Sequence, residues 1–532
     1  MSQEASLYTS RTHALAFWGG CVAVTAGVLL HLPMFLMGRY THYVLAGMPM
    51  GPGMLAGMGL IIAGFAAAGY GLLPRRKSGN IVFEEIAPPE NAPLTKAHWV
   101  QIIVLATALV IDVMKAATLG FVIPGMRVEY GLTFAGVAAL PFSGLLGTTV
   151  GSFLWGALAD LYGRRASILL AAVIFMGTSI CGAMPSFAWN IVMCFIMGLG
   201  AGGMLPVTYA LLAEIMPTRH RGWCLVLVGG IGSIGGYFAT SALSALLQPT
   251  FGWRIMWLIN LPIALILVAL SPVLQESARF LQSMGRVREA RETLARFGIS
   301  VGAAPASATS AQAQALPAAS AVKVRGLLGI TFALTLTALC VGFVNFGVLL
   351  WLPGALMHEG RSMGSASKLI ADSTLLAAPT IVLVAWLYSI WSTKRMLVLA
   401  VATTTLGLLM ILLRDAFGFH LFANPILPVS LLIIGTSGII SMLLPYSAES
   451  YPLRVRGRAT GWVAGFSKSG GLIAQVLGMM ALVPALGLAA GAVAVPCVAS
   501  MLLILFLGHE THGRDLRELE TAEPAMELSS GD

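Results

Sequence analysis

Long apolar runs, separated by short polar or basic stretches, follow one another along almost the whole chain. A helix needs about 20 apolar residues to cross a bilayer core about 30 Å thick, and runs of that length recur from residue 14 to residue 508. The pattern predicts membrane-spanning helices at 14–37, 51–73, 99–123, 136–158, 166–184, 190–213, 222–247, 254–273, 327–351, 369–390, 395–414, 425–447, 459–480 and 486–508. We therefore expect an all-α membrane protein with about 14 transmembrane helices.

One ten-residue pattern occurs twice and divides the chain. Ala213–Gly222 reads A-E-x-x-P-x-R-x-R-G, and Ala448–Gly457 repeats it 235 residues later. Gly235-Gly236 and Gly470-Gly471 follow the two copies at the same distance. Because each copy joins two apolar runs, we predict two related six-helix halves in the same orientation, an internal repeat found in secondary transporters. The first two apolar runs stand outside this repeat.

These runs and the stretches between them predict five parts. Residues 274–298 place apolar side chains at helical spacing among arginines and glutamates, which indicates a short amphipathic helix. Residues 299–322 are rich in Ala, Ser and Gln, as in flexible tethers. The parts are an N-terminal extension with two transmembrane helices (1–95), a six-helix half (96–273), a cytoplasmic amphipathic helix with linker (274–325), a second six-helix half (326–510) and a cytoplasmic tail (511–532).

Composition and charge support a membrane protein and give its orientation. With 57% hydrophobic residues, 10% charged residues and a mean hydropathy of +0.86, a chain of 532 residues has too little polar surface to be soluble. By the predicted topology, 23 of the 31 basic residues fall on one side. The positive-inside rule makes that side and both termini cytoplasmic, in a plasma (inner) membrane. The net charge of +9 follows from this topology, so we predict no nucleic-acid partner.

Other kinds of chemistry find little support. None of the six cysteines forms a CxxC pair, so neither disulfides nor zinc ribbons are expected. No nucleotide-binding loop or nucleophile constellation is recognisable, so we predict neither an enzyme nor a cofactor. The N-terminal extension gathers thioethers and imidazoles, which can bind Cu(I), but apolar packing is the simpler interpretation and no metal site is predicted. These residues are His31, Met34, Met37, His42, Met48, Met50, Met54 and Met58.

Several motifs resemble those of one transporter family. Gly156–Arg165 has the form G-x-x-x-D-x-x-G-R-R and resembles the loop signature between the second and third helices of the major facilitator superfamily. Ala213–Gly222 resembles its motif after the fourth helix. Gln275–Leu281 and Glu510–Arg514 resemble the sugar-porter motifs after the sixth and last helices. Trp351-Leu352-Pro353 is similar to the metabolite and aromatic-acid proton symporters. The resemblance covers about residues 96–520 and implies a six-plus-six bundle that works by alternating access.

The chain also departs from the family patterns. Leu161 stands where a basic residue is familiar, and Cys194 replaces a fourth-helix arginine that several members use in proton coupling. The second copy of the loop signature is reduced to Lys394-Arg395 without its acid. The seventh core helix lacks the pair of glutamines by which sugar porters bind hydroxyl groups. A sugar therefore becomes the alternative substrate.

The motif residues predict a gate on the cytoplasmic side. A transporter must close one side and release it again, and partly desolvated charge pairs suit strong but reversible closure. We expect Asp160 against a helix N-terminus, Arg164 and Arg165 facing opposing carboxylates, and the two motif glutamates pairing with nearby arginines. Topology anchoring alone is the simpler interpretation of the two arginines, but the spacing and the repeat favour gating. The predicted gate residues are Gly156, Asp160, Gly163, Arg164, Arg165, Glu214, Arg221, Glu449 and Arg456.

Three ionisable residues lie deep within apolar runs, where charges are costly and are kept for function or pairing: Asp112, Lys115 and Lys468. Asp112 and Lys115 are three residues apart, so they share a helix face and can pair with each other. Lys468 has no opposite charge in its own helix. One surplus positive charge favours an anionic substrate held by Lys468 and Lys115, with Asp112 as the proton carrier. When the two halves are aligned on the repeated motif, Ser233 of the first half occupies the position of Lys468 in the second.

Aromatic residues give a weaker indication of the substrate. Asn345, Phe346, Trp462 and Phe466 lie on core helices and suit a cavity for an aromatic or planar molecule, although aromatic side chains in membrane helices more often serve packing. We predict a secondary active transporter for proton-coupled uptake of a small organic acid. A sugar or polyol porter, a drug or metabolite exporter, and a transporter-like solute sensor remain alternatives. The expected partners are an anionic small molecule, a proton and the lipid bilayer; the oligomeric state stays open.

Overall fold

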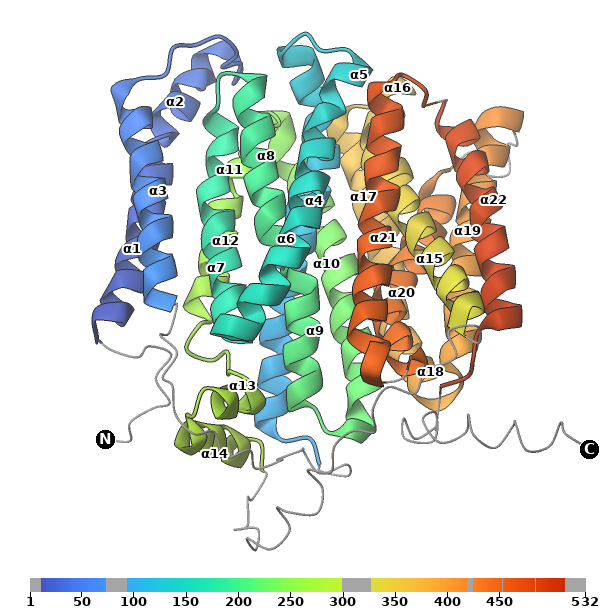
Figure 1. Cartoon of the computed structure of the whole chain (residues 1–532). Coiled ribbons are helices and arrows are strands. Elements are labelled where there is room, and N and C mark those ends of the chain that lie inside the picture. Colours follow the sequence, from blue (N-terminus) through green and yellow to red (C-terminus); the bar gives the residue numbers. More distant parts are fainter. Residues whose placement is uncertain are drawn as a thin grey trace, which may run out of the picture.

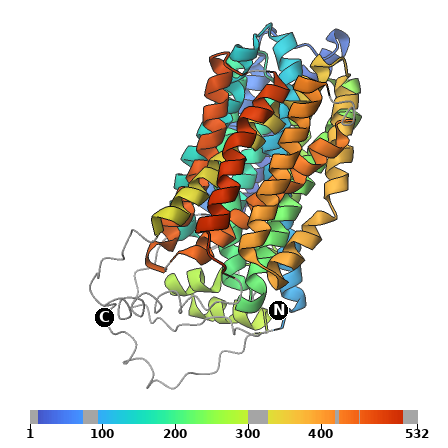
Figure 2. The same ribbon diagram turned by 90° about the vertical axis from the view of Figure 1, so that its right-hand side faces the viewer.

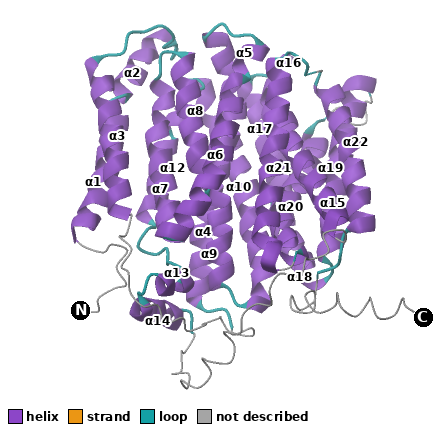
Figure 3. Cartoon of the chain, viewed as in Figure 1, coloured by secondary structure: helices purple, strands orange, loops and turns teal. Residues whose placement is uncertain are grey.

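The computed structural model describes residues 11–72, 93–298, 327–418, 424–451, 453–483 and 485–511. These parts form helices joined by loops, and no strand occurs among them (Figure 3). Twelve of the described helices are long and apolar enough to cross a membrane, judged by length and composition. The prediction of an all-α, multi-pass membrane protein is therefore confirmed. The count of 14 stays a prediction, because these twelve include neither Leu453–Met479 nor the shorter apolar stretch Ile255–Ala269.

The first half forms one side of the bundle, drawn in light blue to green in Figure 1. Several predicted spans are divided into two helices, and one division lies at Gly203. A Cβ at this position would collide with Trp155, so glycine allows the close packing there. The elements are α4 (Lys96–Glu129), α5 (Phe134–Val137), α6 (Ala139–Tyr162), α7 (Arg164–Gly177), η2 (Thr178–Ala183), α8 (Phe187–Ala201), α9 (Met204–Ile215), α10 (Thr218–Phe251), α11 (Ile255–Leu258) and α12 (Asn260–Ala269).

The second half, yellow to red, lies beside the first (Figure 1). Its first span passes through a short π-helical stretch, η4, before Pro353. Its elements are α15 (Leu328–Phe343), η4 (Val344–Leu349), α16 (Leu350–His358), α17 (Met363–Ala377), α18 (Thr380–Ile390), α19 (Thr393–Phe417), α20 (Ile426–Ser450), α21 (Leu453–Met479) and α22 (Leu486–Leu507).

An N-terminal hairpin (residues 11–72) packs on the outside of the first half. It consists of α1 (Arg11–Leu29), α2 (Leu32–Met37), η1 (Gly38–Thr41) and α3 (Pro52–Leu72). Glycines line the contact between α1 and α3: a Cβ on Gly27 would lie 2.6 Å from the carbonyl oxygen of Gly57, and one on Gly20 2.7 Å from that of Gly64. Small residues therefore bring the two backbones close, as in other membrane helix pairs. The hairpin contacts α7 through both α1 and α3.

Two short helices, α13 (Ala278–Ser283) and α14 (Val287–Arg296), lie across one end of the bundle (Figures 1 and 2). The sequence predicts one amphipathic helix here, and the chain forms two because Gly285 adopts a left-handed conformation between them, with φ +74°. We name the ends after Figure 1: the lower end carries α13 and α14, and the upper end carries α2, α5 and α16. The predicted tether 299–322 and residues 512–532 of the predicted tail lie outside the described residues.

The two halves meet closely at the upper end. The rings of Phe134 and Trp351 lie 4.3 Å apart between centroids, and a Cβ on Gly354 would lie 3.7 Å from Pro124. Lower on the same two helices, a Cβ on Gly120 would lie 2.7 Å from the carbonyl oxygen of Leu350. On the α10 side, packing continues along α17, α18 and α20.

Candidate functional site

A cavity of about 260 Å³ lies between the two halves. Its walls come from α4, α6, α9 and α10 of the first half and from α15, η4, α20 and α21 of the second. Most of the lining is apolar, and hydroxyl or amide groups are added by Thr149, Ser152, Ser233, Asn345 and Ser467. Two lining residues on neighbouring helices, Phe153 of α6 and Gly461 of α21, are exposed.

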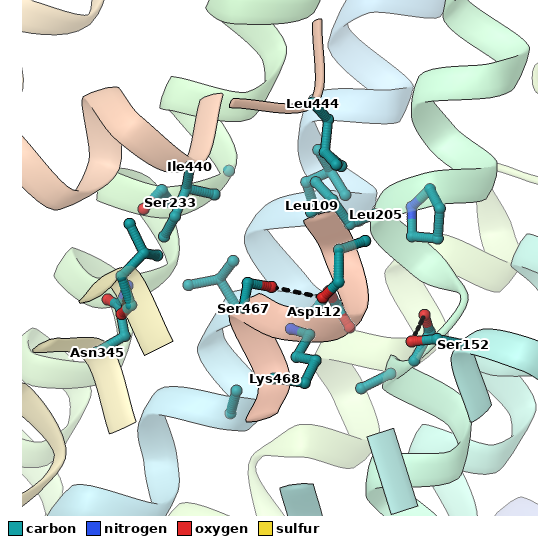
Figure 4. A pocket seen from close by; sticks show the side chains of 18 of the residues that line it. Leu109, Asp112, Ser152, Leu205, Ser233, Asn345, Ile440, Leu444, Ser467 and Lys468 are labelled. Carbon is teal, nitrogen blue, oxygen red and sulfur yellow. Dashed lines mark hydrogen bonds between the residues drawn. The ribbon is translucent and has the colours of Figure 1, made fainter. Parts of the chain in front are cut away.

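Asp112 and Lys468 lie close together in this cavity, one from each half (Figure 4). The carboxylate of Asp112 and the ammonium of Lys468 interact electrostatically. The Oδ1 atom of Asp112 is buried without a hydrogen-bond partner, and the Nζ atom of Lys468 lies 5.4 Å from the centre of the Phe346 ring. Both charges also border a second space of about 50 Å³, which is enough room for water. The pair therefore presents a half-buried acid and a half-buried cation to any bound molecule.

Lys115 occupies a different place from the one predicted. Its side chain is 1% exposed and is absent from the cavity lining. Its ammonium donates to the carbonyl oxygen of Phe175 (2.8 Å) and to the Thr178 hydroxyl (3.4 Å). These atoms lie where α7 ends and η2 begins, and a cation is stabilised at a helix C-terminus by the free carbonyl groups. The predicted pairing of Asp112 with Lys115 is thus not observed, because α4 turns the lysine toward α7 and the aspartate toward α21.

Only part of the predicted aromatic lining reaches the cavity. Asn345 and Phe346 line it. Trp462 instead packs against Phe466 with tilted rings, centroids 4.6 Å apart, and donates to the Thr335 hydroxyl at 2.9 Å. Phe153 and Tyr237 of the first half, which sequence reasoning did not select, are lining residues.

Serine pairs join the two halves beside the cavity. Ser233 donates to Ser437 at 2.9 Å, and the hydroxyls of Ser244 and Ser367 lie 2.7 Å apart, all four being buried. Ser233 also lines the cavity with Lys468, its match in the repeat. The sequence offered no signal for these pairs, since serine is common in membrane helices and the partners are more than 120 residues apart.

At the lower end, the predicted gate residues of the first half form a charge cluster. The guanidinium of Arg164 lies 3.1 Å from Glu214 and 3.3 Å from Asp160. Arg164 and Glu214 are each 17% exposed, whereas the Asp160 side chain is 76% exposed. Arg165 is buried and donates to the carbonyl oxygen of Ser271 at 2.6 Å. The Arg164–Glu214 contact is therefore the partly desolvated pair that the motif spacing predicts.

Glu276, rather than Asp160, caps the N-terminus of α7. Its carboxylate accepts the backbone N–H groups of Arg164 (3.0 Å) and Arg165 (3.1 Å). Burial raises the pKa of the Glu276 carboxyl to about 7, although these N–H groups and the Arg164 charge act to lower it. Gly163 precedes the helix with φ +103°, and a Cβ there would collide with the carboxylate of Glu276. The expectation for Asp160 is corrected, since it lies in the last turn of α6 and not at the N-terminus of α7.

The second half builds a matching cluster from hydroxyl groups. Glu510 accepts the backbone N–H and the hydroxyl of Thr393 at 3.0 and 2.7 Å, and also the Ser392 hydroxyl, at the N-terminus of α19. Glu449 accepts the hydroxyls of Tyr388 (3.1 Å) and Thr511 (2.7 Å). Glu510 is therefore the counterpart of Glu276 in the first half, at the start of the corresponding helix. Its sequence signal is that Glu276-Ser277 and Glu510-Thr511 both follow the last helix of a half.

The remaining predicted gate residues have a less direct placement. Gly222, next to Arg221, faces the second half: a Cβ there would lie 3.5 Å from Tyr388 and 3.8 Å from Glu449, at ordinary contact distance. Gly156 lies on an open face of α6, where a Cβ would meet nothing within 4 Å. The side chain of Arg456 lies outside the described part of the chain.

Comparisons with known proteins agree with this architecture. A family profile described as Major Facilitator Superfamily matches residues 105–475. The niacin transporter NiaP of Acinetobacter baylyi is 27% identical over 443 residues, covering 81% of this chain and 98% of that protein. The gallate transporter of Pseudomonas putida is 28% identical, with 79% of this chain and 94% of that protein covered. The 4-hydroxybenzoate transporter PcaK of the same species is 28% identical, with 72% and 85% covered.

Solved structures show the same fold. A partially occluded, inward-open form of the xylose transporter XylE from E. coli has a TM-score of 0.64 at 17% identity, covering 79% of this chain and 100% of that one. XylE bound to 6-bromo-6-deoxy-D-glucose gives a TM-score of 0.62 at 17% identity, covering 80% and 98%. At this level of identity the likeness concerns the fold alone.

Proposed function

Because this chain belongs to the major facilitator superfamily, we propose that it is a proton-coupled carrier for a small aromatic carboxylate. It acts by alternating access, with the two halves rocking about the cavity. One observation carries the proposal: Asp112 and Lys468 approach each other from opposite halves inside an otherwise mostly apolar cavity.

Charge balance explains how such a pair couples a proton to an anion. In the empty carrier, the Asp112 carboxylate and the Lys468 ammonium sum to zero. When a substrate carboxylate binds Lys468, the cavity holds one surplus negative charge, which is costly in a low-dielectric interior. Protonation of Asp112 restores neutrality. The two neutral states are the ones that cross the membrane, so one proton accompanies each anion and transport is electroneutral.

The position of Lys115 supports this stoichiometry. The carbonyl oxygen of Phe175 and the Thr178 hydroxyl accept its N–H groups behind the cavity. It therefore adds no charge at the substrate site. The surplus positive charge counted from the sequence disappears, and the anion is instead balanced by the proton on Asp112.

Size and lining favour a molecule with one aromatic ring. A cavity of about 260 Å³ is slightly smaller than the roughly 300–1,000 Å³ of drug-sized sites. The Phe346 ring lies beside the Lys468 ammonium, and Phe153 and Tyr237 add further aromatic surface. The names of three similar proteins support this, since niacin, gallate and 4-hydroxybenzoate are aromatic acids.

The orientation follows from the basic loops. We place the lower end, with the Arg164 cluster and α13 and α14, in the cytoplasm of a bacterial-type inner membrane, with both termini on that side. The contacts between Phe134 and Trp351 and between Pro124 and Gly354 then close the outer side. Closure of the outer side supports an inward-facing state, and we propose uptake as the direction of transport.

Counterflow in proteoliposomes tests the proposal directly. Proteoliposomes that contain the purified protein are loaded with unlabelled benzoate, nicotinate or 4-hydroxybenzoate. They should exchange at least one of these acids for labelled external substrate. Asp112→Asn should keep exchange but lose accumulation driven by a pH gradient, because the neutral amide cannot carry a proton. Lys468→Ala should raise the apparent KM about tenfold or more, since a buried charge partner is lost. Lys368→Ala, on an exposed site of α17, is the matched control and should behave like the wild type.

Other results would favour the alternatives. Exchange of xylose but of no carboxylate would identify a sugar porter. Accumulation only in inside-out vesicles would identify an exporter. Binding without any exchange would identify a solute sensor, and accumulation by Asp112→Asn at the wild-type level would exclude Asp112 as the proton carrier.

A further inference from the structure

A second buried charge centre lies at the upper end, outside the cavity. Glu129, the last residue of α4, is 5% exposed and pairs with Arg254, which is fully buried, at 2.6 Å. Trp253 donates its indole N–H to the same carboxylate at 2.8 Å. Arg254 also donates to the carbonyl oxygen of Met184 at 2.8 Å. This centre ties the upper tip of α4 to the segment that precedes α11.

The N-terminal hairpin completes this centre. The loop between η1 and α3 directs the backbone N–H groups of Leu45 (2.7 Å) and Ala46 (3.0 Å) at the Glu129 carboxylate. Leu45 is fully buried, and the next residue, Gly47, donates its N–H to the carbonyl oxygen of Pro185 at 3.0 Å. Figure 1 shows this loop at the upper end of the bundle. The Glu129 carboxylate thus accepts hydrogen bonds from two backbone amides, one indole and one guanidinium.

The loop packs on the first half at this point. Tyr43 packs edge-on against Phe251, with ring centroids 5.9 Å apart, at the upper end of α10. The hairpin helices contact α7 below it. The family profile begins at residue 105, so the hairpin lies before the matched region. A segment outside the matched region therefore supplies two of the hydrogen bonds that hold a buried charge of the first half.

The helix that this loop contacts through Glu129 is α4, and α4 also takes part in closing the upper end. The outer part of α4 packs on α16 of the second half, through Gly120 against the Leu350 carbonyl and Pro124 near Gly354. The same helix carries Asp112 lower down. Opening the upper end requires α4 and α16 to separate. The position of the α4 tip therefore affects how readily the two helices part.

We propose that Glu129 is a positioning residue and that residues 43–47 of the hairpin act as its clamp, holding the tip of α4 so that the upper end stays closed against α16. Removing the clamp shifts the protein toward a state with an open upper end. The existence of the clamp does not depend on which solute is carried. The effect on access to the cavity rests on the alternating-access cycle proposed above.

The test uses cysteine reporters in the full-length protein. The six native cysteines are buried, which keeps background labelling by a maleimide low. Gly354→Cys reports opening of the upper end, where its Cβ has room at 3.7 Å from Pro124. Gly461→Cys, whose Cβ meets nothing within 4 Å, reports access to the cavity from the lower end. Each reporter is combined with Ala46→Pro, which removes one N–H donor, and with Glu129→Gln, which removes the charge but leaves the loop unchanged. Ala46→Val keeps the donor and is the control.

Loss of one hydrogen bond to a charged group should change the equilibrium by about tenfold. We expect labelling at Gly354→Cys to become about tenfold faster with Ala46→Pro and with Glu129→Gln, and labelling at Gly461→Cys to become slower. Faster labelling at the upper reporter without slowing at the lower one supports the clamp but contradicts alternating access. Equal acceleration at both reporters indicates general unfolding and overturns the proposal. Identical rates for Ala46→Pro and Ala46→Val overturn it as well.

Discussion

The two lower-end clusters use one plan with different chemistry. In both halves a glutamate that follows the last helix accepts backbone N–H groups at the start of a helix: Glu276 at α7 and Glu510 at α19. In the first half the residue before the helix is Gly163, which has no side chain to cap with. In the second half it is Ser392, whose hydroxyl also accepts the N–H of Arg395 at 3.0 Å.

The difference shows where each cluster is vulnerable. The first cluster depends on a guanidinium–carboxylate contact and on one buried carboxylate at a helix end. The second distributes its bonds over several hydroxyl groups, each of which contributes less. We therefore expect the first half to be sensitive to charge and pH and the second half to be more tolerant of single substitutions.

Exchanging the two residues that precede the helices should have the largest effect. Gly163→Ser places a side chain at φ +103° and against Glu276, which should cost about 1–3 kcal/mol of stability. The reciprocal change, Ser392→Gly, should cost less, about 1 kcal/mol, because it removes one helix cap and one of several hydroxyl groups that donate to Glu510. Thermal unfolding in detergent measures both. Gly156→Ser, at an open position of the same loop signature, is the control. An equal loss of stability at positions 156 and 163 would show that the backbone conformation of Gly163 imposes no extra cost.

Removing the charge of the first cluster should have the next largest effect. Arg164→Met keeps the apolar length but leaves Glu214, which is 17% exposed, without its guanidinium. We expect a loss of about 1–3 kcal/mol, less than for a fully buried pair because water reaches the site. Tyr388→Phe, which removes one hydroxyl from Glu449, should cost about 1 kcal/mol or less. Stability and initial uptake rates of both variants measure the difference, and comparable losses would contradict the contrast between the clusters.

The smallest effect should be a pH dependence confined to the first cluster. Burial raises the pKa of Glu276 from 4.5 to about 7, so between these values the folded protein holds a proton that the unfolded chain releases. Its contribution to stability is then complete below pH 4.5 and is lost as the pH rises through 7. Glu276→Gln cannot titrate, so the wild type should lose melting temperature relative to this variant between pH 5 and pH 8. Glu510→Gln is the comparison. If the difference in melting temperature between the wild type and Glu276→Gln stays the same from pH 5 to pH 8, the raised pKa of Glu276 is refuted.

Local pattern was enough to predict most of the architecture. Apolar runs of about 20 residues have few alternatives to helices in a bilayer, so the helical fold, the repeat and the family resemblance could be recognised before any coordinates. The Arg164–Glu214 contact followed from motif spacing. Asp112 and Lys468 could be recognised as candidate site residues from the sequence. An ionisable side chain deep in an apolar run has a high free-energy cost in the membrane, wherever its partner lies.

Which groups meet was decided only by tertiary structure. Spacing along α4 allowed Asp112 to pair with Lys115, but packing turns Lys115 to the end of α7 and leaves Asp112 facing Lys468 from the other half. Glu276 and Glu510 reach helix N-termini more than 110 residues away, a contact that sequence spacing cannot reveal. The chain sequence by itself determined that charges must be buried in a membrane bundle, because hydropathy is a local property. The pairing of those charges belongs to the folded molecule, because only packing sets the direction of a side chain and the distance to its partner.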